Sequence, residues 1–200
     1  NRVPVVVHVM ETGNVLTELS DAQIRGAIQA MNERYRKIPG TAGDGNGVDA
    51  TIEFVLAVRD PSGNCTDGIV RIDMTGNATY MASGVMSDVS GITDASLKAI
   101  SVWNQTEYYN IWIVSEIDNN NGGSGIQGYA YFASSHGFSN DGTVVLANNF
   151  KDYSSTTGVH ELGHAFNLYH TFEGDGSGCP TNGNCNADGD RVCDTPPHTR

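Results

Sequence analysis

Three histidines near the C-terminus constrain the fold more than any other feature of the chain. Residues 160–170 read His-Glu-Leu-Gly-His-Ala-Phe-Asn-Leu-Tyr-His. At about 100° per residue, His160 and His164 fall one turn apart on the same face of a helix. His170 would lie on a different face if the helix continued. We therefore predict that the helix ends near Asn167, because asparagine tolerates the left-handed backbone of a helix end. A turn there would bring His170 back to the other two histidines.

The same stretch predicts a catalytic zinc site. Zinc binds imidazole nitrogen, and a catalytic site has three protein ligands and a fourth position left for water. Glu161 follows the first histidine and could act as the general base for peptide hydrolysis. Glu173 is the alternative third ligand, but it lies too close to the motif in sequence to come from a second helix. The predicted zinc ligands are therefore His160, His164 and His170. The remaining histidines, His8, His136 and His198, are predicted to be ordinary core or surface residues.

With these residues in hand, the chain resembles the metzincin zinc endopeptidases, and among them the secreted pappalysin-like, or cytophagalysin, family. The resemblance extends beyond the metal motif and covers nearly the whole chain. The matching segments lie at residues 59–64, 68–71, 110–114, 128–132, 170–172 and 189–197.

The resemblance implies an α/β fold with a twisted mixed sheet, a backing helix and an active-site helix. Residues 1–170 would form an N-terminal catalytic subdomain, and residues 171–200 the start of an irregular C-terminal one. The strand at Gly128, Tyr129, Ala130 and Tyr131 would lie at the sheet edge and bind an extended peptide. Every methionine precedes the zinc motif, so we expect the methionine turn of the clan to be missing from these 200 residues.

The segment after the helix is rich in oxygen ligands among glycines. Calcium prefers carboxylates and carbonyls on flexible loops, and the family resemblance implies calcium in this region. A solvated acidic loop is the alternative interpretation. The candidate ligands are Asp175, Asn184, Asp188, Asp190 and Asp194.

Charge and cysteine content favour a secreted protein. The 11 basic and 23 acidic residues give a net charge of −12, which argues against nucleic acid or an anionic membrane as a partner. No apolar run is long enough for a membrane helix, and the chain begins like a mature, already processed protein. Cys179, Cys185 and Cys193 lie in the glycine-rich tail, where disulfides suit an oxidising compartment. Cys65 would stay free or pair with the tail. The sequence gives no prediction of the oligomeric state.

Hydrophobic patterns and turn residues predict an alternation of strands and helices. A helix should begin after Ser20 as N-cap and run to about Lys37, a short helix capped by Asp94 should reach about Trp103, and the zinc helix should follow residues 154–157. Strands are predicted at 4–10, 51–58, 69–73, 111–114, 129–132 and 143–147.

Three functions fit these features. The first is a secreted zinc endopeptidase acting on protein or peptide substrates. The second is a zinc-bearing binding module that lacks catalytic activity. The third is hydrolysis of a non-protein amide. Sensitivity of peptide cleavage to a chelator would separate the first from the second.

Overall fold

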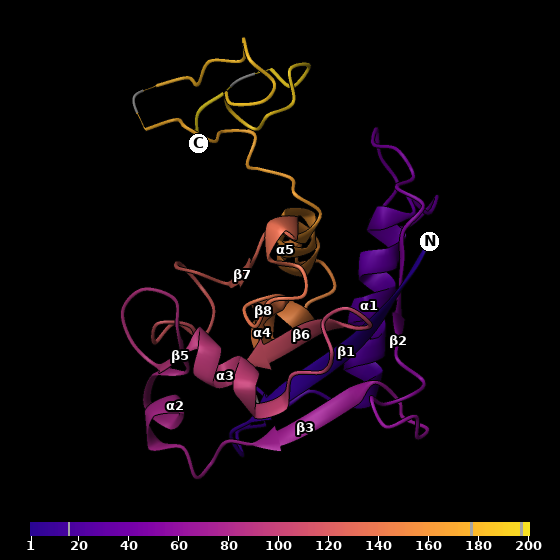
Figure 1. The fold of residues 1–200 in the computed structure, drawn as a ribbon, viewed down its shortest axis with the longest axis vertical. Coiled ribbons are helices and arrows are strands. Elements are labelled where there is room, and N and C mark those ends of the chain that lie inside the picture. Colours follow the sequence, from indigo (N-terminus) through magenta and orange to yellow (C-terminus); the bar gives the residue numbers. More distant parts are fainter. Residues whose placement is uncertain (16, 177, 197) are drawn as a thin grey trace.

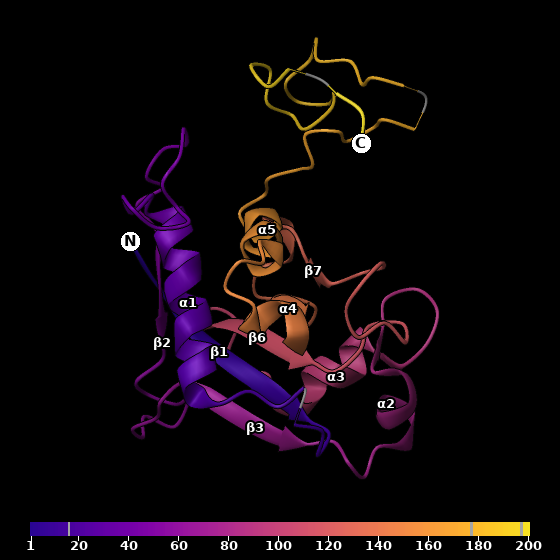
Figure 2. The ribbon, with the colours of Figure 1, turned by 180° about the vertical axis from the view of Figure 1, so that it is seen from behind.

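A six-stranded sheet forms the centre of the molecule, with helices on both of its faces (Figures 1 and 2). The computed structural model describes residues 1–15, 17–176, 178–196 and 198–200. Ser177 and Pro197, which belong to the predicted C-terminal segment, therefore lie outside the described residues, as does Leu16. The α/β class with a mixed sheet is confirmed.

The sheet is parallel except at one edge. β1 lies inside it and pairs with β2 and then β3 along one side and with β6 along the other, while β8 follows β6. β7 is last in the order and is antiparallel to β8. The strands are β1 Arg2–Glu11, β2 Glu53–Leu56, β3 Ile69–Asp73, β6 Tyr109–Val114, β7 Gly128–Ala130 and β8 Thr143–Leu146, and a separate pair is formed by β4 Val85–Met86 and β5 Ile92–Thr93.

Apolar runs in the central strands explain why both faces are covered. Val5, Val7 and Val9 of β1 face one core, and Met10 faces the other. Such continuous apolar runs are typical of parallel strands buried on both faces. The first core takes in α1 Asp21–Tyr35, α4 Ala147–Lys151 and α5 Thr157–Ala165, and the second takes in α2 Ala78–Ser83 and α3 Asp94–Ser101.

Side-chain caps fix where the main helices begin. Ser20 caps α1 in a capping box with Gln23, as predicted. The prediction for α3 is wrong by one residue, because Thr93 is the N-cap and accepts from the Ser96 backbone N–H. The Asp94 carboxylate is instead turned toward Lys98 and Tyr129. The predicted strand at 129–132 also shifts, since β7 ends at Ala130 and leaves Tyr131 outside it.

His8 lies in the core, as predicted, and is fully buried. Its Nε2 lies 2.9 Å from Asn110 Oδ1, and its ring stacks on Trp112. Burial lowers the pKa of His8 to about 4, while the hydrogen bond to Asn110 opposes the shift. The folded protein therefore strongly prefers the neutral ring.

This burial predicts a specific loss of stability in mild acid. The pKa of His8 is near 6.5 in the unfolded chain and about 4 in the folded protein. The free energy of unfolding is therefore unaffected above pH 6.5 and decreases as the pH falls toward 4, because the unfolded chain then binds a proton that the folded protein does not. We expect His8 to account for about 2–3 kcal/mol of destabilisation between pH 7.5 and 4.5. Urea unfolding of the wild type and His8→Phe across this range measures the effect. Parallel pH profiles for the two proteins would contradict it.

Candidate metal centre

The structure brings the three predicted histidines together at the end of α5. The Nε2 atoms of His160 and His164 are 3.1 Å apart, those of His160 and His170 are 3.1 Å apart, and those of His164 and His170 are 3.2 Å apart. Nitrogen lone pairs this close repel one another unless a cation or a proton lies between them. Four nitrogens around zinc at about 2.0–2.1 Å would be separated by about 3.3 Å, so the donor set fits this metal.

A helix-terminating turn delivers the third histidine. Asn167 adopts φ 71°, the left-handed conformation that was predicted for it. The Leu168 N–H donates to the Gly163 carbonyl at 3.0 Å, and the Asn167 N–H donates to the His164 carbonyl at 2.8 Å. These two bonds form a Schellman motif, which ends the helix and reverses the chain.

Polar contacts at the far side of two rings favour the tautomer that a metal needs. His164 Nδ1 lies 2.7 Å from the Leu168 carbonyl oxygen, so its N–H donates there and Nε2 keeps its lone pair. His170 Nδ1 faces the Glu173 carboxylate at 3.5 Å. Glu173 was considered only as a rival ligand, yet it lies behind a ligand-type ring, where an acidic partner orients histidine. The spacing of His170 and Glu173, three residues apart, was the available signal.

Glu161 lies beside the triad, in the layer between α5 and the sheet edge. It is only 7% exposed, and burial raises the pKa of its carboxyl to about 7. A hydrogen bond from the Ala130 backbone N–H opposes that shift by favouring the charged form. The carboxylate is thus tied to β7 and available to the cleft.

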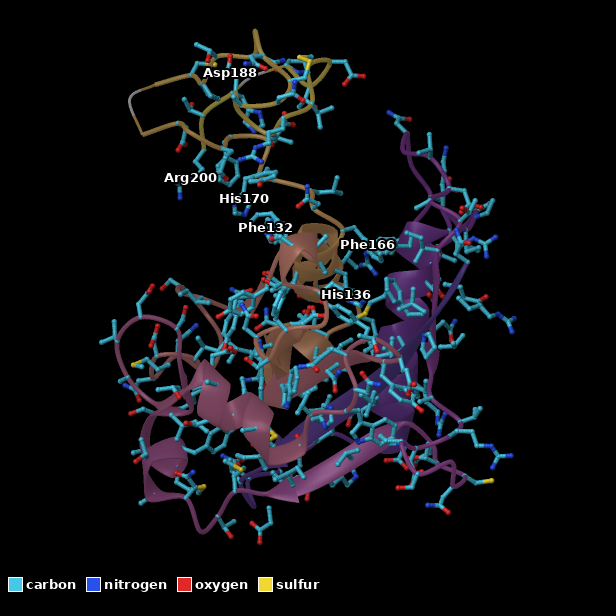
Figure 3. All side chains as sticks on the ribbon, in the orientation of Figure 1. Phe132, His136, Phe166, His170, Asp188 and Arg200 are labelled. Atoms are coloured by element: carbon cyan, nitrogen blue, oxygen red, sulfur yellow. A yellow bond between two sulfur atoms is a disulfide. The ribbon has the colours of Figure 1, made fainter. Side chains whose placement is uncertain are left out.

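An open cleft joins these groups, with a volume of about 450 Å³. β7 forms one wall, and the histidine triad and Glu161 form the other. Phe132 packs against His164 near the predicted third ligand, His170 (Figure 3). Because β8 is the one strand that pairs with β7 in the described sheet, the other edge of β7 carries backbone groups outside the ladder. The Ala130 N–H donates to Glu161, and the remaining groups of this edge can pair with a peptide.

The histidines that were predicted to be ordinary core or surface residues do not join this cluster. His136 bonds to Asp141, and His198 lies against Thr171. In the described part of the chain, the triad is the one group of three or more histidine, cysteine or acidic side chains close enough to share a metal.

The acidic residues of the C-terminal segment make separate local contacts. Asp175 pairs with Arg200, Asp188 accepts from the Gly183 and Asn184 backbone N–H groups, and Asp190 accepts from Val192. Asp188 and Arg200 lie in the segment beyond α5 (Figure 3). Of the three tail cysteines, Cys185 and Cys193 form a disulfide, which confirms that part of the prediction, and Cys179 is free. Cys65, outside the tail, is also free.

A helix with two histidines, a third histidine after a turn and a buried glutamate beside a sheet edge define the metallopeptidase class of site. Residues 91–200, just over half of the chain, match the peptidase family M43 described as pregnancy-associated plasma protein-A. The chain belongs to this family, and the predicted resemblance is confirmed.

Known relatives support the assignment along the whole chain. An extracellular metalloprotease of Pyricularia oryzae is 29% identical over 95% of this chain and 54% of that protein. A second, from Arthroderma otae, is 26% identical over 97% of this chain and 58% of that protein. The chain thus spans about half the length of the curated relatives it matches.

Solved structures give the same result. Mature mirolysin of Tannerella forsythia, in complex with a cleaved peptide, superposes with a TM-score of 0.69 at 29% identity, covering 96% of this chain and 70% of that one. A promirolysin mutant, E225A, gives 0.68 at 29% identity, covering 96% and 62%. None of the helices in the described part of this chain has the length and hydrophobicity needed to cross a bilayer.

Proposed function

We propose that this chain carries the catalytic site of a secreted, zinc-dependent endopeptidase. The convergence of three Nε2 atoms within 3.2 Å of one another is the observation that carries the proposal. The extracellular metalloproteases among the relatives support both the class of reaction and secretion.

His160, His164 and His170 would hold the zinc. When bound, zinc polarises a carbonyl and lowers the pKa of a bound water toward about 7. The chain's own residues carry out the proton transfers. Glu161 accepts the proton of the attacking water and later gives it to the leaving amine. The Ala130 N–H keeps this carboxylate facing the cleft during both transfers.

The free edge of β7 would bind the substrate. Gly128, Tyr129, Ala130 and Tyr131 line or flank the cleft, and an extended peptide can add to this edge through backbone hydrogen bonds. Backbone pairing of this kind favours a polypeptide over a compact non-protein amide. The intact Glu161 beside an open cleft favours catalysis over a binding module without activity.

Cleavage of a proteome-derived peptide mixture, followed by mass spectrometry, tests the proposal. We expect defined cleavage sites that disappear with a zinc chelator and return when zinc is added back. Absence of cleavage by the zinc-loaded protein would contradict the endopeptidase assignment and favour the binding module.

Packing at Gly128 gives a further prediction for the same cleft. A Cβ at this position would lie 3.1 Å from Glu161 Cγ and 3.0 Å from the Val144 carbonyl oxygen. We expect Gly128→Val to push Glu161 aside, to destabilise the fold by about 1–3 kcal/mol and to lower kcat. Gly45→Val is the matched control, because a Cβ there meets nothing within 4 Å. Equal activity of the two variants would refute the tight packing of Glu161 on β7.

We also propose that the irregular segment from residue 171 begins a separate subdomain that binds calcium. No described helix or strand follows α5, and a single stretch of chain connects the segment to the body (Figures 1 and 2). Its carboxylates are the ligand type that calcium prefers. Calorimetric titration with calcium tests this, and an absence of binding by the zinc-loaded protein would reject it.

A further inference from the structure

The strand β7 has two differently occupied faces. Gly128 and Ala130 lie toward α5, where Gly128 packs against Glu161 and the Ala130 N–H donates to the Glu161 carboxylate. Tyr129 and Tyr131 lie on the opposite face, toward α3, because side chains alternate along a strand. The side chains of the two residues that flank Ala130 therefore lie on the face of the sheet opposite to Glu161, the predicted base.

An ion pair on α3, formed by a buried lysine and a partly buried aspartate, contacts these two tyrosines. The Lys98 side chain is 1% exposed, and its Nζ lies 3.0 Å from Asp94 Oδ1. The Tyr129 hydroxyl donates to the same Asp94 oxygen at 2.8 Å. Lys98 Nζ also lies 4.4 Å from the centre of the Tyr131 ring, within range of a cation–π contact. One pair of charges thus holds both tyrosines.

The same lysine fixes the loop that follows β7. Its Nζ donates to the Asn140 carbonyl at 2.6 Å, so Lys98 joins α3 to β7 and to the end of the loop. Burial lowers the pKa of Lys98, and the nearby Asp94 opposes this shift. A buried lysine is tolerated only where partners of this kind compensate for lost hydration. An ion pair placed here can do more than fill the core, because it links three parts of the chain.

The task follows from how few backbone ladder hydrogen bonds hold β7. The strand is 3 residues long and pairs with β8 alone in the described sheet. So short a strand has few ladder hydrogen bonds, and its free edge must still keep a fixed position to pair with a peptide. The contacts of Gly128 and Ala130 with Glu161 attach one face of the strand to α5, and the tyrosines attach the other face to α3.

We propose that the Asp94–Lys98 pair is a positioning device that holds β7 in register with the peptide and with Glu161. Lys98 is a positioning residue, since it does not line the cleft and acts through Tyr131 and the Asp94 carboxylate that binds Tyr129. This inference rests on the proposed peptidase function and adds to it a determinant of extended-peptide binding located on the opposite face of the strand.

The test variant is Lys98→Met, which removes the charge and keeps most of the apolar stem. The control is Arg2→Met, which removes the cation of an exposed ion pair with Glu53. Hydrogen exchange of the zinc-loaded protein should show faster exchange of the Gly128 to Ala130 amides in Lys98→Met alone. For a peptide long enough to span the cleft, KM should rise about 10-fold or more, with zinc content unchanged and a smaller effect on kcat. A minimal peptide that does not reach along β7 should show a smaller rise.

A second pair of variants keeps the test decisive if Lys98→Met fails to fold. Tyr131→Leu removes the ring over Lys98 and should repeat the rise in KM and the faster exchange. Tyr131→Phe keeps the ring but loses the interaction of the hydroxyl with Asp94, so both effects should be smaller than in Tyr131→Leu. Unchanged exchange and KM in folded Lys98→Met and Tyr131→Leu, or equal effects on long and minimal peptides, would overturn the proposal. If the wild type cleaves no peptide, the peptidase function fails, while the exchange rates of β7 still report whether the ion pair holds the strand.

Discussion

Glu161→Gln should lower kcat by about 10²–10⁴-fold while leaving zinc content unchanged. Glutamine has the same shape and can still accept the Ala130 N–H, but it cannot take a proton from water. Stability should stay the same or rise, because the variant removes a carboxyl whose charged form is disfavoured by burial. Steady-state kinetics with a denatured protein as substrate measures kcat. Metal analysis measures the zinc content, and thermal unfolding measures the stability.

A matched control separates this chemistry from general charge effects. Glu107→Gln changes an exposed carboxylate outside the cleft and should retain wild-type kinetics. Should Glu161→Gln keep more than about a tenth of the wild-type kcat, Glu161 would not be the general base, since such a base contributes at least about 10²-fold.

His164→Ala should abolish both zinc binding and activity. Its Nε2 lies 3.1 Å from that of His160 and 3.2 Å from that of His170, so its removal leaves two donors where a catalytic zinc needs three. We expect zinc affinity to fall by more than about 100-fold, because loss of an outer partner of a ligand already costs about 10–100-fold. Competition with a chromophoric chelator measures the affinity directly.

His136→Ala serves as the comparison, because His136 bonds to Asp141 away from the triad. This variant should bind zinc like the wild type. Retention of tight zinc binding by His164→Ala would mean that the metal lies elsewhere or takes its third ligand from another residue.

Local signals explain which features could be predicted from the sequence. β1 and β3 were foreseen because apolar runs end at turn residues, and α1 because Ser20 precedes a run with helical spacing. The convergence of the histidines was foreseen because each step, the helix face and the break at Asn167, depends on neighbouring residues alone.

Features that depend on distant contacts could not be foreseen. The Asp94–Lys98 pair reads in sequence as an ordinary surface pair four residues apart, and only the packing of β7 on α3 buries it. α2 and α4 span 6 and 5 residues, too few for a hydrophobic period to be visible. The role of Thr93 as N-cap was missed because Asp94, the next residue, is an equally good cap by type.

The Schellman turn after α5 has a consequence for how the molecule holds together. His160 and His170 belong to different backbone segments, one helical and one irregular. A metal ion bound by both histidines would crosslink these two segments. Like other crosslinks that close a loop, it would reduce the conformational freedom of the unfolded chain. The metal would thus fasten the C-terminal segment to the sheet domain, and proteolytic nicking just beyond Asn167 would report its loss.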